Sequence, residues 1–202
     1  MKIKKGDEVV VISGKYKGRS LKTTTGPGYR PAMGIVREAL FSMLEARGVE
    51  WAQARVLDLF AGSGSLGFEA PSRGAAMVGF VETAPYAVKV IEANAALLGV
   101  EQERLAVWRE DALKMLARRP EAAYDVIFID PPYEMDVLGK ALASLTSRGW
   151  LAEGSLVNAE VEARRRFDPE KAHPQLSLLA DRTYGQTRVI LWAFTREAEH
   201  GC

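Results

Sequence analysis

Hydrophobic and polar residues alternate along most of this chain in a pattern typical of an α/β protein. Short apolar runs predict buried strands at 56–60, 77–81, 105–108, 126–129 and 156–161. Longer segments between them predict helices at 65–73, 86–98, 112–118 and 135–146. Because crossover helices join strands that run in the same direction, this order predicts a doubly wound, mostly parallel sheet. Two last runs, 176–179 and 187–194, flank a Tyr184-Gly185 turn and predict an antiparallel pair.

The first 50 residues follow a different pattern. A Val- and Ile-rich run at 8–13, a turn with glycine at both ends at 14–18, and a return at 19–23 predict a β-hairpin. An amphipathic helix is predicted over 35–47, where apolar residues recur every four positions before Gly48. We therefore expect an N-terminal extension over residues 1–50 and a larger domain over 51–202.

The composition is that of an ordinary globular protein. The 202 residues are 48% hydrophobic and carry a net charge of +1, which argues against a disordered, collagen-like or coiled-coil chain. Cys202 is the single cysteine, so no internal disulfide is expected. Since the sequence shows neither a membrane-length apolar stretch nor a secretion signal, we expect a cytoplasmic protein without a membrane partner.

The near-neutral total hides a basic N-terminal arm. Residues 1–40 hold nine basic and three acidic side chains, a charge of +6, whereas the remainder carries −5. Such an arm suggests a polyanionic partner, although a solvated hairpin explains the charge equally well. The candidate RNA-binding residues are Lys15, Lys17, Arg19, Lys22 and Arg30.

A glycine-rich turn follows the strand at 56–60. Glycines at 62, 64 and 67 form Gly-x-Gly-x-x-Gly, and Glu82 ends the next strand 20 residues after Gly62. Glycines let the backbone approach a ligand, and an acidic side chain at that strand end can bind ribose hydroxyls. The pattern indicates a nucleoside site, although a tight strand-to-helix turn also requires glycine.

The charge of Asp58, just before the turn, helps to distinguish between a dinucleotide and S-adenosylmethionine as the bound cofactor. A carboxylate there would repel a pyrophosphate but attract the cationic methionine portion of S-adenosylmethionine. Asp111 could contact the adenine, or simply cap the helix that follows it. The candidate cofactor-binding residues are Asp58, Phe60, Ala61, Gly62, Gly64, Glu82 and Asp111.

A second motif, Asp130-Pro131-Pro132-Tyr133, ends the strand at 126–129. The fourth strand of a doubly wound sheet is expected beside the first, with its end at the same crevice as the glycine turn. A carboxylate and a rigidly held proline carbonyl can accept hydrogen bonds from an exocyclic amine and direct its lone pair at a methyl group. Tyr133 can stack on a base. We predict that these four residues are catalytic, although Pro-Pro also serves simply to end a strand.

In this order the two motifs resemble class I amino methyltransferases, and most closely the bacterial 16S ribosomal RNA guanine-N2 methyltransferases of the RsmD type. The resemblance spans about residues 10–194 and includes the segments 12–19, 30–31, 36–41, 57–67, 72–75, 81–82, 125–133 and 184–187. It implies a seven-stranded sheet, S-adenosylmethionine as cofactor, and 16S ribosomal RNA as substrate, free or within the small subunit or its precursor. Residues 32–34 and Pro71 depart from the family pattern, and Pro71 predicts a kinked helix.

Other functions compete with this interpretation. A DNA adenine-N6 or cytosine-N4 methyltransferase shares the Asp-Pro-Pro-Tyr motif, and a dinucleotide oxidoreductase shares the glycines. A non-catalytic RNA-binding ribosome assembly factor would share the basic arm. His173 and His200 have no further ligands nearby in the sequence, and methyl transfer from a sulfonium needs no metal, so we predict no metal site. We expect a monomer.

Overall fold

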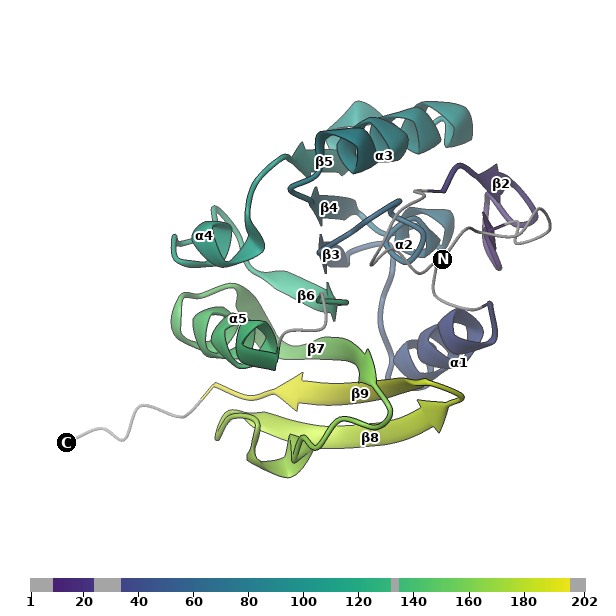
Figure 1. Ribbon diagram of the computed structural model, residues 1–202. Helices are drawn as coiled ribbons and strands as arrows, with labels where there is room; N and C mark the ends of the chain where they lie inside the picture. Colours follow the sequence, from purple (N-terminus) through teal and green to yellow (C-terminus); the bar gives the residue numbers. More distant parts are fainter. Residues whose placement is uncertain (1–8, 24–33, 132–134, 197–202) are drawn as a thin grey trace. The chain divides into compact units, whose positions relative to one another are not determined.

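A computed structural model describes residues 9–23, 34–131 and 135–196 (Figure 1). Arg30, Pro132 and Tyr133 lie outside the described residues. The chain forms two compact units, one through Ala112 and one from Leu113 onward. The expected division at residue 50 stays a prediction.

The first unit begins with the predicted hairpin. Strands β1 (Val9–Val10) and β2 (Ser20–Leu21) pair antiparallel. Gly14 and Gly18 adopt φ angles of 82° and 78° in the turn between them, a region that favours glycine. Helix α1 (Gly34–Glu45) follows and buries Val36, Arg37, Leu40, Phe41 and Leu44. Arg37 is therefore a core residue of the unit and not part of an exposed basic arm.

The sheet of the first unit has three parallel strands, in the order β5-β4-β3 (Figure 1). They are β3 (Arg55–Leu59), β4 (Met77–Val81) and β5 (Leu105–Trp108). Strands β4 and β5 lie at the predicted residues, and β3 begins and ends one residue earlier than predicted. Helix α3 (Pro85–Leu98) connects β4 to the short helix η1 (Gln102–Arg104), and Gly99 ends α3 with a φ of 70°. The parallel order follows from the alternation of strands and helices.

The helix predicted over 65–73 is much shorter than expected. Residues 65–68 form turns, and α2 spans only Glu69–Ser72. The Ala70 N–H donates to the Gly67 carbonyl, three residues back, and Pro71 has no N–H to donate. The structure therefore has a shortened helix here in place of the kinked one predicted at Pro71, and the apolar pattern alone did not reveal it.

The second unit contains four strands in the order β6-β7-β9-β8. Strand β6 (Tyr124–Ile129) pairs parallel with β7 (Leu151–Glu162), whereas β9 (Thr187–Phe194) pairs antiparallel with both β7 and β8 (Leu176–Tyr184). The remaining elements are α4 (Ala112–Leu116), α5 (Met135–Ser147) and η2 (Pro169–Lys171). The predicted antiparallel ending is confirmed.

Tryptophans act as packing residues in the second unit. Trp192 is fully buried and its Nε1–H donates to the Pro169 carbonyl at 2.8 Å. Trp150 stacks on Tyr124, with ring centroids 6.0 Å apart, and donates to the Arg118 carbonyl. In the described part of the chain no helix is long and apolar enough to cross a membrane.

Candidate functional site

The glycine turn after β3 is conformationally strained. Phe60 has a φ of 63°, which is rare for a bulky side chain, and Gly62 and Gly64 have φ angles of 56° and 74°. Such strain costs about 1–3 kcal/mol and persists only where surrounding contacts impose it. Here the Ala61 N–H donates to the Val81 carbonyl at 3.0 Å, which ties the turn to the end of β4. The strained backbone at Phe60 marks this turn as a functional candidate, and no feature of the sequence predicts that strain.

Glu82 holds the same turn from the end of β4. Its side chain is almost fully buried, and its Oε2 accepts the Gly62 N–H at 2.9 Å. Oε1 accepts the Ala84 N–H at 2.8 Å and the Thr83 hydroxyl at 3.3 Å. Glu82 therefore joins the glycine turn to the start of α3. Because each carboxylate oxygen can accept more than one hydrogen bond, ribose binding stays a prediction for this residue.

Asp58 fixes the far end of the turn. It is 2% exposed, and its Oδ2 accepts the Gly67 N–H at 3.0 Å. A Cβ at Gly67 would lie 2.7 Å from that oxygen and would also meet the Phe80 ring. A Cβ at Gly64 would lie 2.8 Å from the Phe68 ring. At Gly64 and Gly67 the space that a Cβ would need is thus occupied by the protein's own side chains, so packing by itself requires glycine there. Cofactor binding at Gly64 stays a prediction.

The end of β5 and the loop after it are joined to Glu82 by backbone hydrogen bonds. The Glu82 N–H donates to the Trp108 carbonyl at 3.0 Å, and the Glu110 N–H donates to the Glu82 carbonyl at 3.2 Å. Asp111 is half-buried and directly precedes α4, in the position of a helix N-cap. Both roles considered for Asp111 stay open. In the first unit, acidic residues of β3 and of the end of β4 thus hold the glycine turn, and the loop after β5 is hydrogen-bonded to the Glu82 backbone.

The basic hairpin uses some of its cations internally. Lys15 and Lys17 are exposed in the turn, and the Lys15 ammonium lies 5.4 Å from the centroid of the Tyr16 ring. The Arg19 guanidinium instead donates to the carbonyls of Leu97 and Leu98, at 2.6 and 3.4 Å. These carbonyls end α3, where a cation is favoured by the helix dipole. Arg19 thus stabilises the docked hairpin, and any contact with RNA is additional to that role.

The second unit presents the end of β6. The strand residues from Val126 to Ile129 are buried, and Asp130 directly after them is exposed. Pro131 is half-buried. The proposed acceptor carboxylate therefore lies at the surface of its unit, where a substrate can reach it.

A second carboxylate, Glu160, lies near this strand end and belongs to no motif visible in the sequence. Ile129, the last residue of β6, pairs in parallel with Ala159 on β7, and an acidic residue follows each of them, Asp130 and Glu160. Glu160 is only 5% exposed. Its acidic side chain in an apolar strand was the available signal, and only the pairing register places it near the end of β6.

Comparisons with known proteins agree with this architecture. A model of the family described as "Conserved hypothetical protein 95" matches residues 9–193. The "Putative rRNA methyltransferase YlbH" of Bacillus subtilis is 35% identical over 90% of this chain and 97% of its own. The "Ribosomal RNA small subunit methyltransferase D" of Escherichia coli K12 is 32% identical over 95% of this chain and 92% of its own.

A solved structure extends the match to the fold. The structure described as "Putative methyltransferase yhhF from Escherichia coli" is 30% identical, with a TM-score of 0.80 over 94% of this chain and 99% of its own. The predicted class, a Rossmann-like α/β methyltransferase fold with seven strands, is confirmed.

Proposed function

Because this chain belongs to the conserved hypothetical protein 95 family, we propose that it is a methyltransferase that modifies a guanine N2 in 16S ribosomal RNA. Two relatives named as rRNA methyltransferases support ribosomal RNA as the substrate, because each matches this chain over at least 90% of both chains. The small-subunit relative directs the proposal to 16S RNA.

S-adenosylmethionine is the methyl donor. The strained turn at Phe60, Ala61, Gly62 and Gly64 and the carboxylates at its borders suit its nucleoside and cationic groups. Its sulfonium supplies an electrophilic methyl group. In the first unit, the buried Asp58 and Glu82 add negative charge near the turn, which favours this cation over a pyrophosphate.

Asp130 and the Pro131 carbonyl accept the two N–H groups of the exocyclic amine. The amine nitrogen is a weak nucleophile because its lone pair is delocalised into the base. Hydrogen bonds to both N–H groups help localise that pair on nitrogen, and a fixed geometry directs it at the methyl carbon. The predicted stacking of the base on Tyr133 belongs to this proposal.

Glu160 favours guanine over adenine. Guanine presents an N1–H donor beside its amine, whereas adenine presents an acceptor nitrogen at that position. A buried carboxylate near the end of β6 therefore attracts the guanine edge and repels the adenine edge. Cytosine also has an acceptor nitrogen beside its amine, so it offers no N–H donor there for the Glu160 carboxylate.

Transfer of a labelled methyl group tests the proposal. The protein is incubated with labelled S-adenosylmethionine and unmodified 16S RNA, free or in small subunits, and the product nucleoside is identified by mass spectrometry. We expect N2-methylguanosine. Label in adenine or cytosine, or in DNA, would contradict the base assignment, and RNA binding without transfer would favour an assembly factor.

Variants assign the roles of the two carboxylates. Asp130→Ala should lower transfer by about 100- to 1000-fold while cofactor affinity persists. Glu160→Gln should lower transfer to guanine, and Glu162→Gln, an exposed change on the same strand, should have no effect. Equal activity of the Glu160 and Glu162 variants would remove Glu160 from the proposal.

A further inference from the structure

Asn94 connects the N-terminal hairpin to the glycine turn. It lies on α3, is fully buried, and uses all parts of its amide group. Its Nδ2 donates to the Ser63 carbonyl at 3.1 Å and to the Lys22 carbonyl at 2.9 Å, while its Oδ1 accepts the Lys22 N–H at 2.8 Å. One side chain thus binds both the cofactor turn and the chain just after β2.

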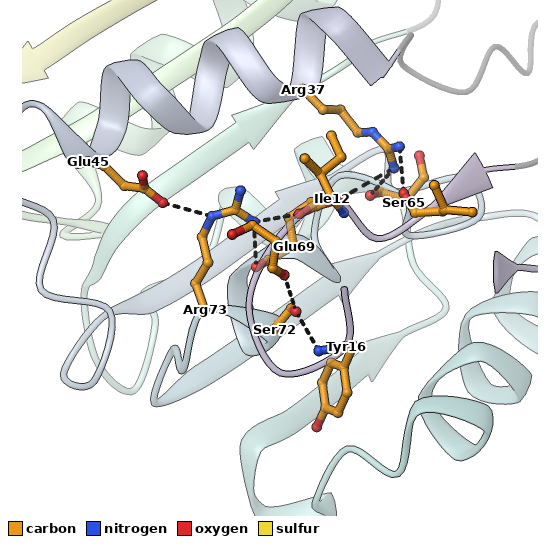
Figure 2. Close-up of polar contacts among 10 residues, drawn as sticks. Ile12, Tyr16, Arg37, Glu45, Ser65, Glu69, Ser72 and Arg73 are labelled. Carbon is orange, nitrogen blue, oxygen red and sulfur yellow. Dashed lines mark hydrogen bonds and ion pairs between the residues drawn. The ribbon is translucent and has the colours of Figure 1, made fainter. Parts of the chain in front are cut away.

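Arg37 makes a matching connection on the other strand of the hairpin. Its guanidinium donates to the Ser65 carbonyl at 3.1 Å and to the Val10 carbonyl at 2.9 Å (Figure 2). Its side chain is 3% exposed. Two side chains on different helices therefore each contact one carbonyl of the glycine turn and one side of the hairpin. Arg37 binds β1, and Asn94 binds Lys22, directly after β2.

The hairpin loop also rests directly on α2. The Ile12 N–H donates to the Glu69 Oε1 at 2.8 Å, and the Tyr16 N–H donates to the Ser72 hydroxyl at 3.0 Å (Figure 2). A Cβ at Gly14 would collide with the Ser72 carbonyl. Because α2 directly follows the glycine turn in the chain, a displacement of the turn would also disturb the contacts between α2 and the hairpin loop.

We propose that Asn94 and Arg37 are positioning residues that couple cofactor binding at the glycine turn to RNA binding by the hairpin. The proposal rests on the function proposed above. A ligand that orders the turn fixes the carbonyls of Ser63 and Ser65, and so fixes the two side chains that hold the hairpin. By linkage, RNA that orders the hairpin must strengthen cofactor binding by the same factor.

Calorimetry with S-adenosylhomocysteine measures this factor. We expect unmodified 16S RNA to tighten its binding to the wild type at least about fivefold, the lower range of known coupling factors. Asn94→Ala and Arg37→Lys should bring the factor close to one, because each breaks a shared contact. Glu92→Ala, an exposed change on α3, should keep the wild-type factor. A merely structural role would change stability but leave the factor intact.

Hydrogen exchange tests the same coupling without RNA. S-adenosylhomocysteine should slow exchange of the Lys22 and Tyr16 amides at least about fivefold in the wild type. It should not do so in Asn94→Ala or, if that variant fails to fold, in Arg37→Lys. Unchanged exchange in the wild type, or a full coupling factor in a folded variant, would overturn the proposal. Methyl transfer to RNA without this protection would refute the coupling alone, whereas protection without transfer would refute the proposed function alone.

Discussion

Replacing Glu69 by glutamine removes one charge from a buried ion cluster. Glu69 is fully buried, and its carboxylate pairs with Arg73 and lies 3.9 Å from Arg37 (Figure 2). The side chains of the two arginines are 7% and 3% exposed, and Glu69 is the buried carboxylate that both of them face. Breaking a buried pair typically costs about 3–5 kcal/mol, because a buried charge loses its partner. For a chain of this size we expect the melting temperature to fall by roughly 6–20 °C.

Glu45 provides a matched control on the same partner. Its carboxylate lies 2.9 Å from the Arg73 guanidinium, but its side chain is 50% exposed. An exposed pair contributes about 0–1 kcal/mol, so Glu45→Gln should hardly change the unfolding free energy. Urea unfolding of both variants at neutral pH measures the difference.

A third variant isolates the cause of the loss. Adding Arg73→Met to Glu69→Gln removes one of the cations that lost this buried partner, and part of the lost stability should return. If Glu69→Gln and Glu45→Gln differed by less than about 1 kcal/mol, burial of the cluster would not govern its energy.

Other predictions concern packing, pH and ligands. Gly67→Ala should destabilise the protein by about 1–3 kcal/mol in chemical unfolding and weaken cofactor binding, because its Cβ would displace the neighbouring carboxylate. The hydrogen bond from Arg188 lowers the pKa of Asp181 from its ordinary value of 3.8. The pair therefore stabilises the fold at pH values above 3.8, and this stabilisation is lost as the pH falls through the lowered pKa. Asp181→Asn should remove this acid dependence in urea titrations from pH 7 to about pH 3. The logarithm of the RNA affinity should fall with the logarithm of the salt concentration at a slope of about −3. Charge reversal at Lys15 and Lys17 should flatten this slope and leave cofactor affinity unchanged. Equal slopes for the wild type and the variant would show that the hairpin is only a solvated element. S-adenosylhomocysteine, but not a nicotinamide dinucleotide, should raise thermal stability, by about 2.7 kcal/mol at 100 times its dissociation constant.

Local pattern was enough to place most elements. Strands β4 and β5 lie at the predicted residues, and α3 and α5 agree within one residue of the predicted ends. Burial of a strand or of one helix face requires apolar residues at a fixed spacing, and this spacing is visible in the sequence. The glycine turn and the acidic end of β6 were found for the same reason, since their residue types stand next to each other in the chain. The ligands assigned to them stay predictions.

Tertiary structure decided what the polar side chains do. The Ile12 amide and the Glu69 carboxylate that accepts its hydrogen bond are 57 residues apart. Similarly, the bond from Arg19 to the end of α3 spans 78 residues, and only strand register brings Glu160 near the end of β6. RNA binding by Arg19 stays a prediction. A buried polar group must find a partner wherever the fold supplies one, and nothing in its neighbouring sequence specifies which group that is. The sequence thus determined where the chain is buried, while the partners of its buried charges followed only from the way distant segments pack.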